Sequence, residues 1–430
     1  MSTTPKNKII GALLGTIVEY YDYSLYGFSA SVIAAKFFPN TDLLTSLANT
    51  FAVYAVAYLA KPLGALVFGR IGDYLGRKIA LNFTIIGMVV PTVLIGLLPE
   101  YSTFGIWSTV ILVLCRFIQG IFMAGEYDGA AIYVIEHLGA KYHYTASAIT
   151  RTTGVIGLLL GIGATNFFNA HIFPEWGWRI PFLLSLPLAL ITLYYRRQLT
   201  ETPDFQDAKR LQTPLRSIIN LCQYQWQILL IVILIAGGFG VTYQVSIVFM
   251  KQYLPIVLAQ TSLIISTFSV LLVICLGVSM PIAGLCADRF GAMIVIKISV
   301  CATIIACMLL SVAITYNMLN LALAACLLLA TFIAPFNALA HGIIIKGFPV
   351  NERYRSISLG HACGGMLMSG TANYICLMFM KSFGWYLFPV IYVAAFAILS
   401  YIAISIYQSQ FKSASRTSNL HNSYQPENTR

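Results

Sequence analysis

Long apolar stretches alternate with short polar connections along nearly the whole chain. A helix that crosses the hydrocarbon core of a bilayer needs about 20 predominantly apolar residues. Stretches of this kind lie at 10–33, 46–69, 79–98, 106–135, 146–170, 180–197, 226–250, 262–285, 292–314, 319–345, 356–380 and 385–408. The pattern predicts an all-α integral membrane protein with twelve transmembrane helices in two groups of six.

One long polar segment interrupts this pattern in the middle of the chain. It carries bases and acids from Arg196 to Arg216, and we expect it to be a solvated connecting loop. The predicted organisation is an N-terminal six-helix half, a cytoplasmic central loop, a C-terminal six-helix half and a cytoplasmic tail, at 1–197, 198–224, 225–410 and 411–430.

An internal repeat supports the division into halves. Gly-Arg-Ile-Gly-Asp-Tyr-Leu-Gly at 69–76 has a counterpart, Gly-Leu-Cys-Ala-Asp-Arg-Phe-Gly, at 284–291. Each copy falls between the second and third predicted helices of its half. Repeated halves around a central cavity are typical of secondary transporters, and we expect a pseudo-two-fold axis between them.

The charge distribution supports a membrane protein and predicts its orientation. Charged residues are 10% of the chain and hydrophobic residues 58%, whereas soluble domains carry about 25% charge. Of the 26 Lys and Arg residues, twenty lie on one side of the predicted bundle and four on the other. Because positive charge concentrates in the cytoplasm, both termini are predicted to be cytoplasmic.

Carboxylates within the predicted helices are candidates for proton coupling, because charge at membrane depth is costly and usually functional. Glu19 and Asp22 of the first helix are three residues apart and share a face. Carboxylates in a low dielectric readily take up and release a proton. We predict a proton-coupling set of Glu19, Asp22 and Glu126. The alternative is that they pair with bases and hold helices together.

The fourth helix carries the main candidate for binding a substrate carboxylate. Arg116 remains charged in proteins, and Gln119 lies one turn further on. At about 100° per residue, Glu126 falls nearer to Arg116, and Asp128 is predicted to point away from it. The alternative role for Arg116 is an ion pair between helices.

Further candidate binding residues lie on other helices. Tyr23 and Tyr26 continue the face of the first helix, and Lys61 adds positive charge to the second. Tyr243 and Gln244 are the predicted cavity residues of the second half. Arg151 of the fifth helix either joins the cavity or extends its side chain to the cytoplasmic surface.

The sequence shows little that indicates other classes of function. The nine cysteines include no Cys-x-x-Cys pair, so no metal site is predicted. His341 and His361 are more often packed, hydrogen-bonding residues than proton carriers. The basic residues lie between apolar runs rather than in a nucleic-acid-binding patch, so no nucleic acid is expected. The expected partners are lipid, protons and a small metabolite, and we expect a monomer.

Several motifs, in order along the chain, resemble the metabolite:H⁺ symporter family of the major facilitator superfamily, which includes proline/betaine, 2-oxoglutarate, citrate and shikimate permeases. The motifs are Glu-Tyr-Tyr-Asp at 19–22, Pro-Leu-Gly-Ala at 62–65, Gly-Asp-Tyr-Leu-Gly-Arg-Lys at 72–78, Arg-Phe-Ile-Gln-Gly at 116–120, Gly-Glu-Tyr at 125–127, Trp-Gly-Trp-Arg-Ile-Pro-Phe at 176–182 and Glu-Thr-Pro-Asp-Phe at 201–205.

The resemblance implies the major facilitator fold in a bacterial inner membrane. It implies proton-coupled import of a small carboxylate-bearing metabolite by alternating access, driven by the proton gradient and without a cofactor. The substrate would be a zwitterion such as proline or betaine, or a di- or tricarboxylate. An uncoupled facilitator or exchanger is the alternative; a membrane receptor or enzyme fits less well.

The repeated loop also implies a conformational latch. An acidic group near a helix end can pair with a neighbouring helix in one conformation only. The alternative is a plain turn with topogenic bases. Because the second copy has Ala292 and Met293 where bases are expected, we predict a weaker latch there. The predicted latch residues are Gly69, Asp73, Gly76, Arg77, Lys78, Asp288 and Arg289.

Overall fold

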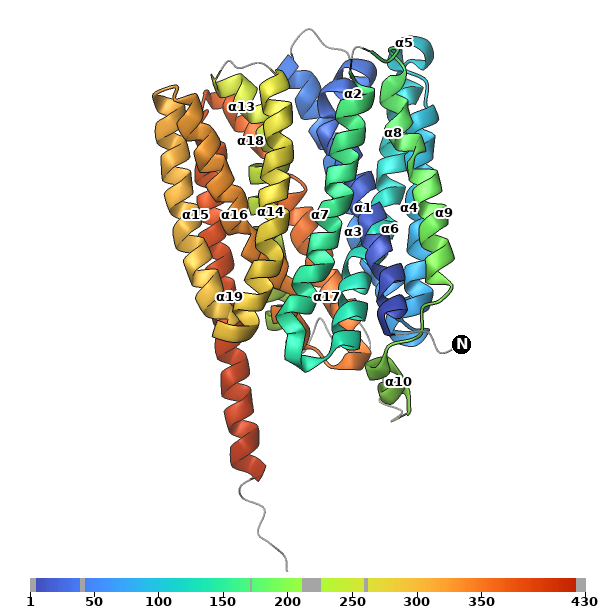
Figure 1. Cartoon of the computed structure of the whole chain (residues 1–430), viewed down its shortest axis with the longest axis vertical. Helices are drawn as coiled ribbons and strands as arrows, with labels where there is room; N and C mark the ends of the chain where they lie inside the picture. The colour runs from blue at the N-terminus through green and yellow to red at the C-terminus, as the bar shows by residue number, and fades with distance from the viewer. Residues whose placement is uncertain (1–4, 39–42, 171, 211–225, 259–261, 423–430) are drawn as a thin grey trace, which may run out of the picture.

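The protein is a bundle of long, roughly parallel helices (Figure 1). The computed structural model describes the chain except for residues 1–4, 39–42, 171, 211–225, 259–261 and 423–430. The described residues form helices and no strand.

The helices before the central loop are α1 (Pro5–Phe28), α2 (Ala30–Phe37), α3 (Leu43–Tyr74), α4 (Arg77–Leu97), α5 (Tyr101–Phe104), α6 (Ile106–Leu138), η1 (Ala140–Tyr142), α7 (His143–Phe168), η2 (Gly177–Arg179), α8 (Ile180–Leu183), α9 (Ser185–Arg196) and α10 (Pro203–Arg210).

The helices of the second half are α12 (Trp226–Tyr243), η3 (Gln244–Phe249), α13 (Met250–Leu258), α14 (Ser262–Phe290), α15 (Ala292–Thr315), α16 (Leu319–Ile344), η4 (Ile345–Gly347), α17 (Val350–Gly364), η5 (Gly365–Ser369), α18 (Ala372–Phe383) and α19 (Phe388–Asn422). Both η3 and η5 are π-helical segments that interrupt long spans.

Eleven helical stretches of the described chain are long and apolar enough to cross a membrane. They match eleven of the twelve predicted spans and confirm the all-α membrane class. The remaining helix is α1, whose 24 residues include Glu19, Asp22 and several tyrosines. These residues lower its hydropathy, and α1 packs among α6, α7 and α9 within the bundle.

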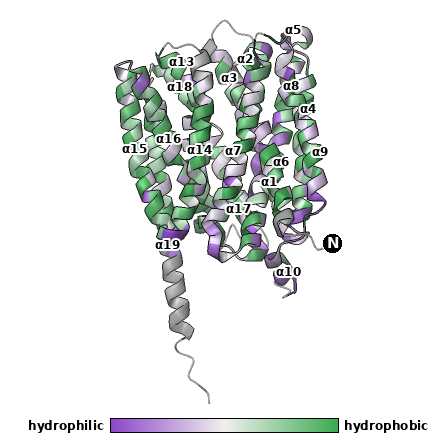
Figure 2. Cartoon of the chain, in the orientation of Figure 1, coloured by the Kyte–Doolittle hydropathy of each residue, from purple (hydrophilic) through white to green (hydrophobic). Residues whose placement is uncertain are grey.

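The outer surface of the bundle suits a lipid solvent. Large apolar side chains point outward along the spans, for example Leu59, Val67 and Phe83, each at least half exposed. Figure 2 shows hydrophobic residues along the length of the helices and hydrophilic residues at α10. The largest fully buried side chains, in contrast, include arginines: Arg77, Arg116, Arg151 and Arg196.

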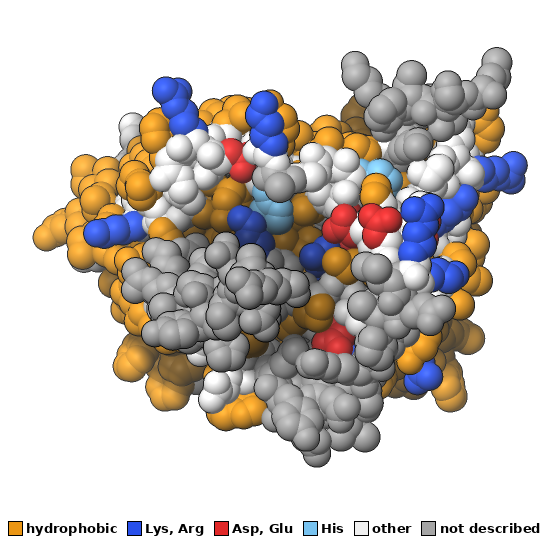
Figure 3. Space-filling view, turned by 90° about the horizontal axis from the view of Figure 1, so that it is seen from below, with side chains coloured by type: hydrophobic (Ala, Val, Ile, Leu, Met, Phe, Trp, Pro, Cys, Tyr) orange, Lys and Arg blue, Asp and Glu red, His pale blue; other side chains and the backbone are white. Residues whose placement is uncertain are grey.

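One end of the bundle carries the N-terminus, α10 and the projecting end of α19 (Figure 1); we call it the α10 end. Figure 3 views this end: Lys and Arg side chains lie both at its rim and nearer its centre, and Asp, Glu and His side chains also lie on it. The predicted tail begins as a continuation of α19, which runs to Asn422.

The first part of the predicted central loop is folded rather than solvated. The Glu201 carboxylate accepts hydrogen bonds from the backbone N–H groups of Arg77 (3.0 Å) and Lys78 (3.3 Å). An acid at this position satisfies unpaired N–H groups at the start of α4. Arg196, which we grouped with the loop, is fully buried at the end of α9. Residues 211–224 of the predicted loop lie outside the described residues.

Candidate functional site

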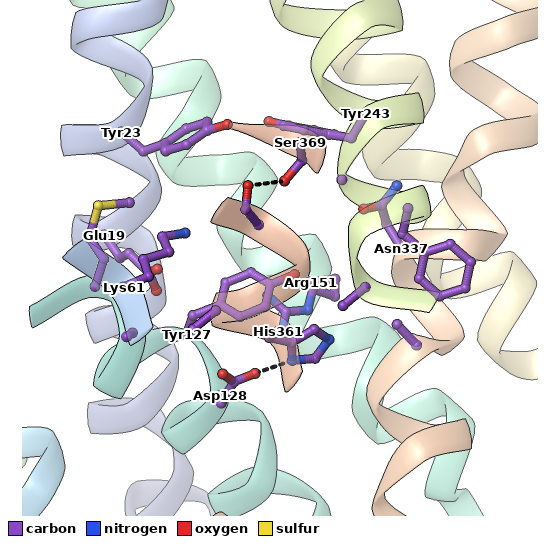
Figure 4. A pocket seen from close by; sticks show the side chains of 18 of the residues that line it. Glu19, Tyr23, Lys61, Tyr127, Asp128, Arg151, Tyr243, Asn337, His361 and Ser369 are labelled. Carbon is purple, nitrogen blue, oxygen red and sulfur yellow. Dashed lines mark hydrogen bonds and ion pairs between the residues drawn. The ribbon is translucent and has the colours of Figure 1, made fainter. Parts of the chain in front are cut away.

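A cavity of about 100 Å³ lies between the two halves of the bundle. Figure 4 shows many of the side chains that line it. The N-terminal half contributes α1, α3, α6 and α7, and the C-terminal half contributes α12, η3, α14, α16, α17 and η5. Of the predicted site residues, Glu19, Tyr23, Lys61, Tyr243 and Gln244 line this cavity.

The cavity holds charges of both signs. Glu19, Lys61, Asp128 and Arg151 reach it from four different helices. Lys61 Nζ lies 4.3 Å from the centre of the Tyr58 ring. One carboxylate oxygen of Glu19 is buried and has no hydrogen-bond partner among the described residues. Such an unsatisfied acceptor in a cavity wall is available to a ligand.

Tyrosines form much of the remaining wall. The hydroxyls of Tyr23 and Tyr58 lie 2.9 Å apart. Gln244 Nε2 donates to the hydroxyls of Tyr58 (2.7 Å) and Tyr54 (3.2 Å). Within the described chain, the Tyr243 hydroxyl and Gln244 Oε1 have no hydrogen-bond partner. The wall therefore offers aromatic faces together with free polar atoms.

Arg151, whose position the sequence left open, lies in the cavity rather than at the surface. Its guanidinium carbon is 3.5 Å from the centre of the Tyr127 ring, and its Nη1 donates to the Tyr20 hydroxyl (3.1 Å). The side chain is only 2% exposed. Stacking on Tyr127 holds this cation inside the protein.

Asp22 and Arg116 belong to a separate buried network behind the cavity wall. Asp22 accepts hydrogen bonds from the hydroxyls of Thr92 (2.9 Å) and Ser185 (2.5 Å). Gln119 Nε2 donates to Thr92 Oγ1 (2.6 Å), and Arg116 Nη1 donates to Gln119 Oε1 (2.9 Å). The side chains of Thr92 and Gln119 thus connect Asp22 to Arg116.

Arg116, Gln119 and Tyr26, which we predicted as binding residues, do not line the cavity. The Arg116 guanidinium lies 4.4 Å from the centre of the Tyr26 ring and 5.3 Å from that of Tyr54. Its Nε and Nη2 atoms have no hydrogen-bond partner, and it forms no ion pair, in the part of the chain that the structure describes. Tyr54 and Gln244 connect this network to the cavity.

Glu126 and Asp128 point to opposite sides of α6, and Glu126 does not share the cavity. Glu126 forms an ion pair with Arg196, not with Arg116, and accepts a hydrogen bond from the Thr84 hydroxyl (2.5 Å). Asp128 points into the cavity. Helical phase predicts that the two acids diverge, but which one faces the cavity depends on the helices packed around α6.

Asp128 joins two histidines that we expected to be ordinary packing residues. Asp128 Oδ1 lies 2.7 Å from His341 Nε2 and 2.5 Å from His361 Nδ1. The aspartate comes from the N-terminal half and the histidines from the C-terminal half. The sequence contains a charged residue in one half and lone histidines in the other. Only the tertiary fold shows that these residues meet.

The first copy of the repeated loop connects the halves at the α10 end. Asp73 accepts a hydrogen bond from the backbone N–H of Arg355 (3.2 Å) and lies 3.7 Å from Arg77 Nη1. Arg77 also donates to the Val350 carbonyl (2.7 Å). A Cβ on Gly69 would lie 2.8 Å from Arg355 Cα. Glycine therefore lets α3 and α17 approach closely.

Two other predicted latch residues act within the first half. Gly76 has φ +111°, a conformation that favours glycine and that turns the chain between α3 and α4. Lys78 contributes its backbone N–H to Glu201.

The second copy connects the halves through its aspartate. Asp288 accepts hydrogen bonds from the backbone N–H groups of Tyr144 (3.0 Å) and Thr145 (2.9 Å) and from the Thr145 hydroxyl (2.6 Å). The contact caps the start of α7 and does not need the bases absent at Ala292 and Met293. Arg289 lies over the ring of its neighbour Phe290.

The chain is similar to known transporters over most of its length. The model of the Major Facilitator Superfamily matches residues 12–372. The proline/betaine transporter of Salmonella typhimurium (strain LT2) is 31% identical over 415 residues, which cover 92% of this chain and 82% of the relative. The glycine betaine/proline/ectoine/pipecolic acid transporter OusA of Dickeya dadantii is 30% identical over 412 residues, which cover 92% of this chain and 81% of that relative.

One similar solved structure is that of the proton:xylose symporter XylE bound to 6-bromo-6-deoxy-D-glucose. Its TM-score to this chain is 0.76 at 16% sequence identity, and the match covers 93% of this chain and 95% of that chain. This likeness confirms the predicted fold, and the relatives confirm the resemblance inferred from the motifs. The protein therefore belongs to the Major Facilitator Superfamily of transporters, within its metabolite:H⁺ symporter family.

Proposed function

We propose that this transporter imports a small zwitterion, such as proline or a betaine, together with protons by alternating access. The observation that carries the proposal is a cavity with two cations, a wall of tyrosines and a Glu19 carboxylate, one oxygen of which has no hydrogen-bond partner among the described residues. Relatives at about 30% identity carry names that include proline and betaine.

Charges of both signs favour a zwitterion over the di- or tricarboxylates that the sequence left open. Lys61 and Arg151 would bind the solute's carboxylate through charge-assisted hydrogen bonds. Glu19 and the faces of Tyr23 and Tyr58 would stabilise its ammonium group by charge and cation–π attraction. A second carboxylate on the solute would instead meet Glu19 or Asp128, and two negative charges repel strongly in a buried site.

Asp22 is the proposed site of the transported proton. It is buried and bonded only to neutral hydroxyls in the described structure, so it can exchange a proton without breaking an ion pair. Its link to Arg116, and from there to Tyr54 and Gln244, would couple the proton to occupancy of the cavity. Glu19 would bind the solute, and Glu126 would stabilise the packing of the N-terminal half.

The proposed orientation places the α10 end and both termini in the cytoplasm of a bacterial inner membrane, as the positive-inside rule requires. Contacts of Asp73 and Asp288 hold the halves together at that end. Separating these contacts would release solute to the cytoplasm. At the other end, Lys251 Nζ bridges the halves through the Phe28 carbonyl (3.0 Å).

Uptake by proteoliposomes tests the proposal. Labelled proline, glycine betaine, 2-oxoglutarate and citrate would each be offered with and without an inward proton gradient. We expect gradient-driven accumulation of a zwitterion and none of the two acids. Accumulation of an acid alone would overturn the substrate class, and uptake indifferent to the gradient would indicate a facilitator.

A further inference from the structure

We propose that Asp128, His341 and His361 form a proton-binding lock that holds the two halves together between the cavity and the α10 end. The lock rests on the proposed function, since it gives a proton-coupled carrier a second site at which a proton controls opening. His361 is the residue that takes the controlling proton.

The three side chains meet across the boundary between the halves. Asp128 comes from α6, His341 from α16 and His361 from α17. Asp128 and His341 are at most 1% exposed, and Figure 4 shows His361 bonded to Asp128 at the cavity wall. His341 lies near the end of α16, and His361 follows Val350 and Arg355, the residues of α17 that contact the first copy of the repeated loop. Separating the halves at the α10 end must therefore break this cluster.

Asp128 determines the tautomer of His341. An ionised carboxylate only accepts hydrogen bonds, so the ring proton of His341 sits on Nε2, 2.7 Å from Asp128 Oδ1. Arg151 Nη2 lies 2.8 Å from His341 Nδ1 and 3.1 Å from Nε2. This adjacent cation opposes a second proton on His341, which leaves His361 as the ring that gains one.

The charges around His361 give this second proton a definite effect. Asp128 is the carboxylate that contacts His361 directly, and Arg151, a cation of the same cavity, is stacked on Tyr127. Protonation adds a positive charge to a ring that already donates to the Asp128 carboxylate, so a hydrogen bond between the halves becomes an ion pair between them. The other titratable groups that face the same cavity are Glu19, Tyr20 and Tyr23 of α1, Tyr58 and Lys61 of α3, Tyr127 of α6 and Tyr243 of α12.

The same three residues could suggest a metal ion, because their ligand atoms all lie within 4.8 Å of one another. A metal-binding histidine normally donates its other ring N–H to a carboxylate or carbonyl. Here that position of His341 faces the guanidinium of Arg151. The cation would repel a metal ion and cannot accept the N–H, so the cluster is built for a proton.

A cysteine at the closed end reports on the lock without any solute. Ser147 is fully buried, and its hydroxyl donates to the Ala338 carbonyl of the other half (2.6 Å). In Ser147→Cys, modification by N-ethylmaleimide would require opening of the α10 end. Peptide mass spectrometry would measure the rate at that site in the purified full-length protein at about pH 5.5 and about pH 8, on either side of the usual histidine range.

The comparison variant is His361→Asn, whose amide can replace the Nδ1–H donor but cannot gain a proton. At about pH 8 we expect it to be labelled as fast as the parent. At about pH 5.5 the parent should be labelled on the order of tenfold more slowly than the variant, within the usual range of coupling between sites. His143→Gln is the matched control, because His143 Nε2 lies 2.7 Å from the Gly342 carbonyl in the same interface.

Equal labelling of the parent and His361→Asn at both pH values would overturn the lock. Loss of the pH effect in His143→Gln would show that His143, and not His361, causes the effect, and this result would also overturn the lock. Protection that requires added Zn²⁺ and disappears with a chelator would identify a metal site instead. Because no solute or gradient is used, failure of the lock and failure of proton-coupled uptake remain distinguishable.

Discussion

The buried charges discussed above have different sets of partners, and in our proposal these sets separate binding, coupling and packing. Glu19, Lys61 and Arg151 line the cavity. Asp22 accepts hydrogen bonds from neutral hydroxyls. Glu126 pairs directly with an arginine. We therefore expect the same type of substitution to have different effects at these positions.

Replacing Glu19 by glutamine should weaken zwitterion binding while preserving the shape of the cavity. The change removes the only carboxylate proposed to face the solute's ammonium group, so we expect KM for proline or glycine betaine uptake to rise by about tenfold, as for loss of a charged hydrogen bond. Glu175→Gln, at an exposed position outside the cavity, is the control. An unchanged KM in Glu19→Gln would refute this role.

Replacing Glu126 by glutamine should destabilise the protein. The change leaves the Arg196 guanidinium buried without its ion-pair partner, and breaking such a pair typically costs about 3–5 kcal/mol. A lower Tm in detergent would measure this effect. Adding Arg196→Gln should recover part of the loss. If Glu126→Gln keeps its Tm but loses proton coupling, the proton role first predicted for Glu126 is correct.

The helices that close the α10 end depend on small residues and aspartates at their contacts. Gly69 lets α3 approach α17, and Asp288 caps α7 from the other half. The hydrogen bonds at this end are accepted by the carboxylates of Asp73 and Asp288, and bonds to charged groups contribute about 1.5–3 kcal/mol each. In the proposed transport cycle these contacts break and form again.

Gly69→Ala should shift the protein toward an open α10 end. The added methyl group would meet the Arg355 backbone at 2.8 Å, and overpacking of this kind costs about 1–3 kcal/mol. Hydrogen exchange at the start of α7, measured by mass spectrometry, should become faster. Gly163→Ala is the control because nothing lies within 4 Å of its added Cβ. Unchanged exchange in Gly69→Ala would contradict the proposed latch.

At the scale of elements, runs of apolar residues were enough to predict the spans, because length and hydropathy decide membrane crossing. They could not reveal α10, a short polar helix bound through Glu201 and Phe205. They also could not pair Glu126 with Arg196, which is 70 residues away. Partners of this kind depend on which helices become neighbours, and helical phase does not contain that information.

At the scale of the whole molecule, two halves surround a cavity, and we propose that two separate groups respond to protons. Asp22 and Arg116 lie on one side, within the N-terminal half, and the lock of Asp128 and His361 spans both halves. The internal repeat predicted two halves around a central cavity, but it did not predict which residues would meet there. In our account, protons act at both places, but only Asp22 carries the proton that travels with the solute.

Solute-driven proton flux tests this claim most directly. Proteoliposomes with a pH-sensitive dye inside, at equal pH on both sides, would receive external glycine betaine or proline. The account predicts acidification of the lumen with the wild type and with Asp207→Asn, whose side chain is exposed on α10, and none with Asp22→Asn. Entry of labelled solute without acidification, or acidification that persists in Asp22→Asn, would contradict it.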